Sequence, residues 1–269
     1  MAIGEKLQRI IKNSDSIYGS GYMAGQSNGL TIGYQRGYDE AYPAGIQLGY
    51  RNGKKDGAED ERRAFWRIYQ QEGKRTNYQT AFAGFGFDFD NFYPMFDIRP
   101  TQSCATMFFG WNKSETQKGS LRKRLLECNV ELDTSQTTNL SQTFYNCYFT
   151  DIPTIVMPGG VDNKWIFANN PYLTLIDGVI VEENTVFTGC FKENTALEQV
   201  IFHGVIGQNG LDVSDCIHLN KDSIQSIVEC LKDYSGDGTT HTVTLGAENL
   251  AKLTAQEIAN ARAKGWKLV

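Results

Sequence analysis

The sequence predicts an α+β protein with glycine-rich helices at the N-terminus, then a short irregular solenoid of stacked coils, and helices at the C-terminal end. Two observations support this prediction. Between residues 173 and 214, short apolar runs alternate with polar turns, as in a chain that coils repeatedly on itself. Between residues 21 and 57, glycine recurs at every fourth position with one exception, a period that suits a helix better than a strand.

The coils are clearest where one apolar run ends in a turn and another run follows. In the clearest example the apolar residues and the turn are Leu197, Val200 and Phe202, the turn at Gly204, and then Leu211 and Val213. A single coil cannot bury its own apolar face, so neighbouring coils must stack on one another. This pattern is typical of a leucine-rich repeat. We assign residues 121–269 to a repeat domain of this kind with coils of unequal length.

Helices and further strands are expected around the coils. SLRKRLLEC, residues 120–128, carries leucines at helical spacing behind a serine that can cap the helix. Residues 222–232 form an amphipathic pattern, and residues 254–265 begin with a capping box of Thr254 and Glu257. Strands are expected at residues 130–132, 240–245 and 266–269.

The glycine ladder is the main feature of residues 1–72, which we assign to a helical stalk or oligomerisation segment. Each glycine inside a helix costs about 1 kcal/mol relative to alanine, so close packing against a second backbone must compensate. Pro43 predicts a break between two helices. The ladder can serve as an oligomerisation or attachment stalk, or fold as a helical hairpin within one chain. The expected helix-packing residues are Gly21, Gly25, Gly29, Gly33, Gly37, Gly45, Gly49, Gly53 and Gly57, together with Tyr22, Tyr34, Tyr38 and Tyr50.

A charged helix at residues 54–72 ends the ladder, and an aromatic-rich joint follows at residues 73–120. We expect the aromatic residues of the joint, such as Phe82 and Phe92, to cap the open end of the coil stack, since solenoids need capped ends. Asp88 and Asp90 alternate with them. This pair lacks the further oxygen ligands of a calcium or magnesium site, so we interpret both as solvated carboxylates.

Composition excludes several classes of function. The net charge of −5 and the pI of about 5.3 argue against nucleic-acid binding through a basic surface. No signal peptide is recognisable, and no apolar run is long enough to span a membrane. The cysteines have no CxxC spacing, so we expect small buried apolar residues and no metal site. They are Cys104, Cys128, Cys147, Cys190, Cys216 and Cys230.

No catalytic motif is present, and we expect neither an enzyme nor a cofactor. The histidines, His203, His218 and His241, lack metal-ligand spacing. Acidic residues such as Asp177, Glu182 and Glu183 can be imagined as a glycosidase pair, but any acidic protein supplies such pairs. Trp165 and Tyr172 are suited to stacking on sugars, or alternatively to burial.

Five stretches resemble known families. The sequence FYNC ending at Cys147 and the looser VFTGC ending at Cys190 are similar to BspA-type leucine-rich repeats. Residues 222–269 resemble the C-terminal ends of tail-associated proteins of phages and prophages from Gram-positive bacteria, and residues 64–84 resemble the segment that precedes the repeats there. The glycine ladder resembles the deca-GX3 segments of certain iron–sulfur assembly adaptors.

The phage resemblance implies a non-enzymatic structural or host-recognition component of a tail or baseplate. Such a protein is made in the bacterial cytoplasm and ends in the virion. It is expected to form a homo-oligomer, with a trimer as the working number, and to contact other tail or baseplate proteins. Its binding surface would face a host cell-surface protein or glycan, with no nucleic acid and no membrane insertion. The alternative is a bacterial leucine-rich-repeat interaction protein, either a surface adhesin or a cytosolic adaptor.

Overall fold

The structure is a computed structural model that describes residues 66–67, 70, 73–83, 92–111 and 118–269. The glycine ladder, with all of its predicted helix-packing residues, lies outside the described residues. So do Asp88 and Asp90 of the joint and most of the helix predicted at residues 54–72.

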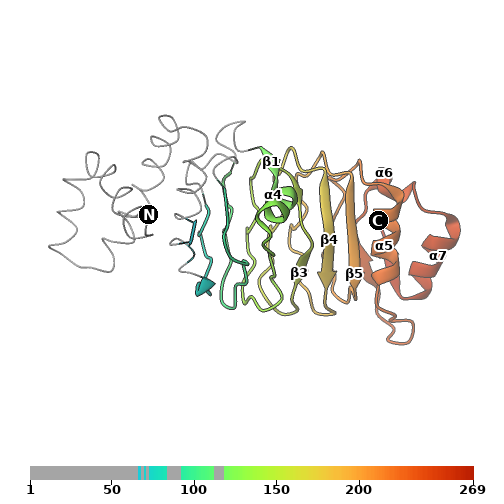
Figure 1. The fold of residues 1–269 in the computed structure, drawn as a ribbon. Coiled ribbons are helices and arrows are strands. Elements are labelled where there is room, and N and C mark those ends of the chain that lie inside the picture. Colours follow the sequence, from blue (N-terminus) through green and yellow to red (C-terminus); the bar gives the residue numbers. More distant parts are fainter. Residues whose placement is uncertain (1–65, 68–69, 71–72, 84–91, 112–117) are drawn as a thin grey trace, which may run out of the picture.

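Five parallel strands form one sheet in the described part of the chain (Figure 1). They are β1 (Gly119–Ser120), β2 (Phe149–Ile152), β3 (Ile155–Met157), β4 (Leu175–Val181) and β5 (Gln199–Gly204). β2 and β3 pair with one edge of β4, and β5 pairs with the other. Pro153 separates β2 from β3, because proline has no N–H to donate to a neighbouring strand. The fold is mixed α and β with a parallel sheet, in agreement with the prediction at this coarse level.

A column of phenylalanine rings fills the core behind the sheet. The N–H of Phe144 donates to the carbonyl of Ile166, and the N–H of Phe167 donates to the carbonyl of Cys190. These bonds align successive segments of chain, so the rings of Phe144, Phe167 and Phe191 stack at centroid distances of 5.8 and 5.4 Å. The segments that begin at Phe144, Phe167 and Phe191 thus each contribute a buried ring to a continuous apolar core.

Buried asparagines tie neighbouring segments together beside this column. The side chain of Asn170 accepts the N–H of Cys147, 23 residues earlier, and donates to the carbonyls of Phe144 and Phe167. Its own N–H donates to the side chain of Asn194, 24 residues later. Buried polar groups are costly unless they are paired, so these bonds fix how one segment lies on the next.

Helix α4 (Leu121–Cys128) forms as the sequence predicts, with Ser120 accepting the N–H of Lys123 at its start. It lies against the sheet because Asp151 of β2 accepts from both the Ser120 hydroxyl and the Arg122 N–H. In Figure 1 it crosses the sheet near β1.

The prediction of a strand at residues 130–132 is wrong. Only an isolated parallel bridge between Ile98 and Leu132 occurs there. The reason lies in Thr134, whose hydroxyl both accepts the N–H of Val156 and donates to its carbonyl. One side chain therefore satisfies the β3 backbone groups that a neighbouring strand would have used.

Helices and a small sheet close the C-terminal end of the molecule (Figure 1). They are α5 (Lys221–Cys230), β6 (His241–Val243), α6 (Ala247–Leu250), α7 (Ala255–Ala263) and β7 (Trp266–Leu268). The capping box of Thr254 and Glu257 is confirmed at the start of α7. β6 and β7 are parallel. None of the helices among the described residues combines the length and apolar character needed to cross a membrane.

Aromatic residues pack together at the other end of the described part. Trp66 is fully buried and packs edge-on against Phe82 and Phe92. The N–H of Phe82 donates to the carbonyl of Met107 and that of Phe108 to the carbonyl of Thr143, so part of the predicted joint continues the stack of segments. The Gln70 side chain accepts the N–H groups of Met95 and Phe96. The packed unit therefore includes residues that precede position 73, where the sequence locates the start of the joint.

Candidate recognition surface

The turns at one edge of the stacked segments repeat a left-handed backbone conformation. Thr106, Gln142, Trp165 and Gly189 occupy equivalent positions, with φ between 54° and 61°. The N–H of each of the first three donates to the segment that follows, as when Trp165 donates to the carbonyl of Thr188. Most side chains are strained in this conformation, so its recurrence shows that the stacking bonds impose the turn.

The indole ring of Trp165 packs against the neighbouring turn at Gly189, where the absence of a side chain leaves room for the ring. A β-carbon on Gly189 would collide with the indole ring of Trp165, so the ring occupies the space that glycine leaves. Tyr145 lies on the other side, with its ring centroid 6.3 Å from that of Trp165. The Trp165 side of the molecule nevertheless stays open, since 45% of the residue is exposed. We call Trp165, Gly189 and Tyr145 the Trp165 platform.

The platform continues along the edge as a strip of aromatic rings. Phe109 stacks on Tyr145 at a centroid distance of 5.4 Å and an interplanar angle of 10°. Both residues are half-buried. The indole N–H of Trp165 makes no hydrogen bond within the described part of the chain. Tryptophan and tyrosine supply large rigid contact areas and are enriched among the residues that dominate binding energy.

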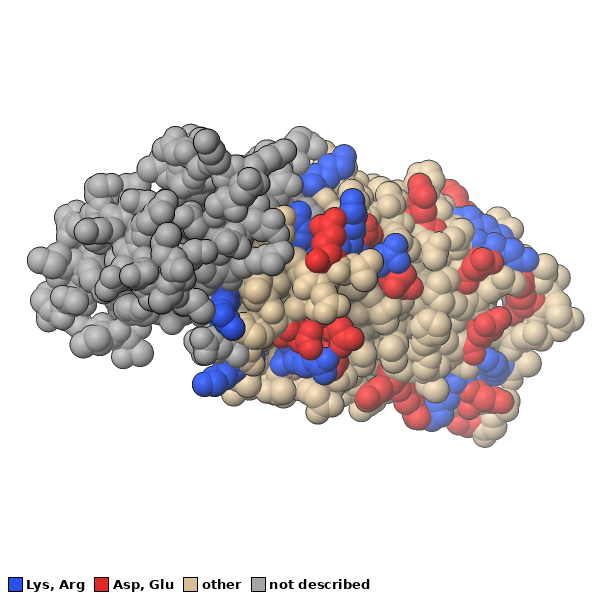
Figure 2. Space-filling model, in the orientation of Figure 1, with Lys and Arg blue, Asp and Glu red and all other residues tan. Residues whose placement is uncertain are grey.

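A second exposed apolar area lies on the outer face of the sheet. Val156, Ile180 and His203 form one row across β3, β4 and β5. Ile180 and Val205 are 38% and 40% exposed. Figure 2 shows uncharged surface beside β5 and a few charged side chains over β4, where Asp177 pairs with Arg122.

Tyr172 differs from Trp165, although the sequence treats them alike. The Lys118 ammonium lies 4.2 Å from the centre of its ring, and Tyr148 packs edge-on at 4.8 Å. Tyr172 is therefore partly covered from two sides, and Trp165 is the better exposed of the two.

The carboxylates that could be imagined as a catalytic pair each have a separate partner. Asp177 forms an ion pair with Arg122 at 3.3 Å, Glu182 accepts the N–H of Gly159, and Glu183 pairs with Lys232. His203 and His218 are exposed, whereas His241 stacks on Tyr234 and is half-buried. Among the described residues, no cluster of three or more histidine, cysteine or acidic side chains is arranged to hold a metal ion.

The sequence predicts six buried cysteines; four are buried, whereas Cys128 and Cys230 are only half-buried, and all six are free. Burial raises the pKa of Cys104 to about 11 and the pKa values of Cys147 and Cys216 to about 12. The Cys147 thiol donates to the carbonyl of Phe108, and the Cys190 thiol to that of Asn163. These thiols stay protonated near neutral pH and act as small core residues whose sulfur atoms form hydrogen bonds inside the core.

The two cysteine-containing turns quoted above do not occupy equivalent positions. Phe144 aligns with Phe167 and Phe191, so Cys147 corresponds to Asn170 and Asn194 and not to Cys190. The signal that aligns the segments is a phenylalanine followed three residues later by cysteine or asparagine. Comparison with protein-family models, with curated proteins and with solved structures finds no match to this chain.

Proposed function

We propose that this chain is a non-enzymatic recognition and structural protein of a phage tail or baseplate. Its described part would form a short, irregular leucine-rich-repeat solenoid that presents a binding surface. The glycine ladder at residues 21–57 would attach or oligomerise the protein. The tail context rests on the resemblance of residues 64–84 and 222–269 to tail-associated proteins.

Support for the solenoid comes from the way successive segments return to the same positions. The asparagine bonds recur at intervals of 23 and 24 residues, and the phenylalanine rings stack in one column. Intervals of 20–29 residues with a strand in each unit are typical of leucine-rich repeats. The irregularity lies before Leu140, where α4 and its flanking residues lengthen one coil.

The Trp165 platform carries the recognition proposal. It combines an exposed indole, a fixed orientation and a free N–H donor, a combination that suits an amphipathic ligand such as a host glycan or a surface protein. A side chain that is already immobilised loses little conformational entropy on binding, which favours affinity.

Binding to host cell walls tests the proposal. Labelled full-length protein is mixed with isolated walls of the Gram-positive host, and the bound fraction is measured for the wild type, Trp165→Ala and Ile217→Ala. Ile217 is a matched control because it is also apolar and 41% exposed. Trp165→Ala is expected to weaken binding about tenfold or more, as for a hot-spot tryptophan. Equal binding by all three proteins would contradict the assignment of the site.

A glycine substitution separates platform geometry from folding. Gly189→Ala introduces a β-carbon that displaces the indole, in a left-handed conformation that alanine rarely adopts. Gly110→Ala imposes a similar backbone strain at φ 76°, with no atom near the new β-carbon. Only Gly189→Ala is expected to change the fluorescence of Trp165 and to reduce wall binding. Detection of this chain in purified phage particles tests the tail assignment, and its absence from them would overturn that assignment.

A further inference from the structure

The loop that follows β5 contains an asparagine with a glycine directly after it. Asn209 and Gly210 are both exposed, and Gly210 has a φ of 99° with no atom near the position of a β-carbon. Two further Asn-Gly pairs, at residues 28–29 and 52–53, lie outside the described residues. Within the described part, Asn209 is the one asparagine whose following residue has a backbone nitrogen with no side chain beside it.

The Asn209 side chain is held by the C-terminal sheet. The N–H of Thr242 in β6 donates to Oδ1 of Asn209 at 2.7 Å. An N–H group donates only to an acceptor, so this bond identifies the amide oxygen and directs Nδ2 to the other side. Neither Nδ2 of Asn209 nor the N–H of Gly210 makes a hydrogen bond with a described residue. Cγ of Asn209 therefore carries a polarised oxygen and an unbonded amino group, and the next backbone nitrogen is also unbonded.

This arrangement suits ring closure between the two residues. When a base removes its proton, the nitrogen of Gly210 can attack Cγ of Asn209, because both atoms lie in one short stretch of chain. Negative charge then develops on Oδ1, toward which the N–H of Thr242 already points. The bond between Cγ and Nδ2 breaks, and Nδ2 takes up a proton and leaves as ammonia. The product is a cyclic succinimide.

We propose that Asn209 is a site of spontaneous deamidation in the folded protein. Water opens the succinimide at either of its two carbonyl carbons. Opening at Cγ gives aspartate with the original main chain. Opening at the backbone carbonyl carbon gives isoaspartate, whose main chain runs through the former side chain and is one methylene group longer. In both products, water has supplied the oxygen that replaces the amide nitrogen, and the new carboxyl group ionises.

The modification would act where the C-terminal sheet is joined to the stacked segments. Besides the bond between Asn209 and Thr242, the N–H of Thr244 donates to the carbonyl of Leu211. The N–H of Val213 donates to the carbonyl of Thr244. Three hydrogen bonds of this join therefore come from the five residues that begin at Asn209.

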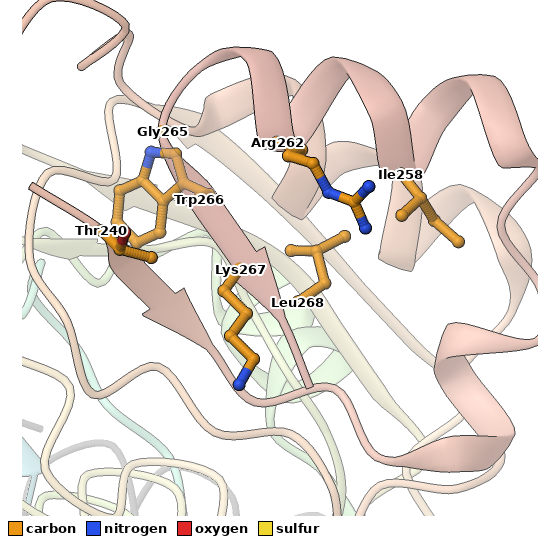
Figure 3. A pocket seen from close by; sticks show the side chains of 7 residues that line it. All are labelled: Thr240, Ile258, Arg262, Gly265, Trp266, Lys267 and Leu268. Atoms are coloured by element: carbon orange, nitrogen blue, oxygen red, sulfur yellow. The ribbon is translucent and has the colours of Figure 1, made fainter. Parts of the chain in front are cut away.

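The C-terminal sheet is in turn anchored to α7. β6 pairs with β7, and in Figure 3 Ile258 and Arg262 extend from α7 toward Leu268 of β7. Isoaspartate removes the side-chain acceptor of the Thr242 N–H and lengthens the main chain before Leu211. It should therefore loosen the join, whereas aspartate keeps both the acceptor oxygen and the chain length.

Peptide mass spectrometry of the incubated full-length protein tests the proposal. Trypsin cleaves after Lys192 and Lys221, and residues 193–221 form one peptide because neither lysine nor arginine lies between these sites. The same peptide contains two control asparagines, the buried Asn194 and Asn220, the N-cap of α5. Fragmentation assigns the mass increase of deamidation to one of the three, and electron-based fragmentation distinguishes isoaspartate from aspartate. A sample digested without incubation gives the starting level.

Asn209 is expected to react about tenfold faster than Asn194 or Asn220 in the folded protein, because only its neighbour lacks a β-carbon. The reaction should be faster at alkaline pH, because a base must remove the proton of the Gly210 nitrogen. Gly210→Ala should slow it about tenfold, because the added β-carbon crowds the attacking nitrogen. Gly238→Ala imposes a similar strain at φ 70° in open space, and it should leave the reaction at Asn209 unchanged.

Two results would overturn the proposed site. Equal conversion of the three asparagines would show that the glycine confers no preference. Conversion of Asn209 in urea-unfolded protein, but not in folded protein, would show that the fold prevents ring closure.

Hydrogen exchange at the Thr242 amide tests the consequence for the join. Exchange should be faster in the isoaspartate form than in the unmodified protein, because the acceptor is lost. Asn209→Asp is the matched control, and its Thr242 amide should stay protected. Equal protection in the isoaspartate form would refute the loosening of the join.

Discussion

Substitution of the buried side chain of Asn170 should strongly lower the free energy of unfolding. This side chain makes three hydrogen bonds from a fully buried position, to Cys147, Phe144 and Phe167. Asn170→Ala leaves one backbone N–H and two carbonyls without partners, and each unsatisfied buried group costs about 1–3 kcal/mol. We expect a loss of about 3 kcal/mol or more in the free energy of unfolding, measured by urea denaturation.

Asn194→Ala is the matched control for this prediction. The Asn194 side chain accepts one bond, from the Asn170 N–H, and its amide nitrogen has no partner among the described residues. The loss should be smaller, about 1 kcal/mol. Equal losses for the two variants would contradict the view that the Asn170 side chain carries three bonds and the Asn194 side chain one.

Glu257 makes stability depend on pH. A hydrogen bond from the Thr254 N–H, together with bonds from the Gln225 amide and the Thr254 hydroxyl, lowers the pKa of this carboxyl from 4.5 to about 2. Because the folded-state pKa is depressed, the stabilisation is present above pH 4.5 and is lost as the pH falls toward 2. Glu257→Gln should therefore lower the melting temperature at pH 7, and the difference from the wild type should disappear near pH 2.

Glu229→Gln provides the comparison for Glu257→Gln. It removes the same charge from an exposed carboxylate on α5 that forms no hydrogen bond with a described residue. Its melting temperature should track that of the wild type across the whole range. A pH-independent effect of Glu257→Gln would assign the contribution to packing and not to the charged cap.

At the scale of elements, α5 protects the edge of the sheet. Ser223 and Ser226 accept two N–H groups of β5 from a helix, in place of a further strand. Replacing both with alanine leaves two buried donors unsatisfied, at a cost of about 2–4 kcal/mol together. An unpaired edge also templates association between chains. We expect reduced stability in denaturation and concentration-dependent aggregation by light scattering.

Ser214→Ala is a suitable control for the serine pair. Ser214 bonds only to Asp212 within its own exposed turn, so its loss should change stability by a few tenths of a kcal/mol. If the Ser223→Ala, Ser226→Ala double variant were as stable and soluble as Ser214→Ala, edge protection by α5 would be refuted.

Helices α4, α5 and α7 could be predicted from sequence because their signals are local, whereas the four-residue α6 was not predicted. Ser120 in front of α4 and the capping box of Thr254 and Glu257 lie within the residues that they cap. The prediction of a strand at residues 130–132 was wrong because the Thr134 side chain bonds to the Val156 backbone groups that such a strand would have used. Nothing local to the run Val130 to Leu132 reveals that bond.

The Trp165 platform lies beyond sequence reasoning for the same reason. Whether Trp165 is buried or exposed depends on Gly189 in the next segment, and the two are brought together only by the stacking bonds. The alignment of segments was recoverable in part. Phenylalanine three residues before asparagine at Asn170 and Asn194 repeats in the sequence, but the two phenylalanine–cysteine turns suggested a different register.

At the scale of the whole molecule, the described part is one packed unit, with buried aromatic residues at its N-terminal side and α5–α7 at its C-terminal side. Trp66 and Gln70 belong to this unit through Phe92 and Phe96. A truncation that tests the glycine ladder must therefore keep them, and a chain beginning at residue 64 meets that requirement. Starting at residue 73 would remove a buried tryptophan and confound folding with assembly.

The oligomeric state of the two chains tests the role of the ladder. If residues 21–57 assemble the protein, the full chain should have the solution mass of a discrete oligomer by light scattering, with a trimer as the proposed number. The chain beginning at residue 64 should be a folded monomer, with folding checked by circular dichroism. If both chains are monomers, the ladder must pack within its own chain. The reason is that nine glycines in the predicted helices need a second backbone packed closely against them. Two oligomers would move the contact to the described part, where the outer face of the sheet is the surface to examine first.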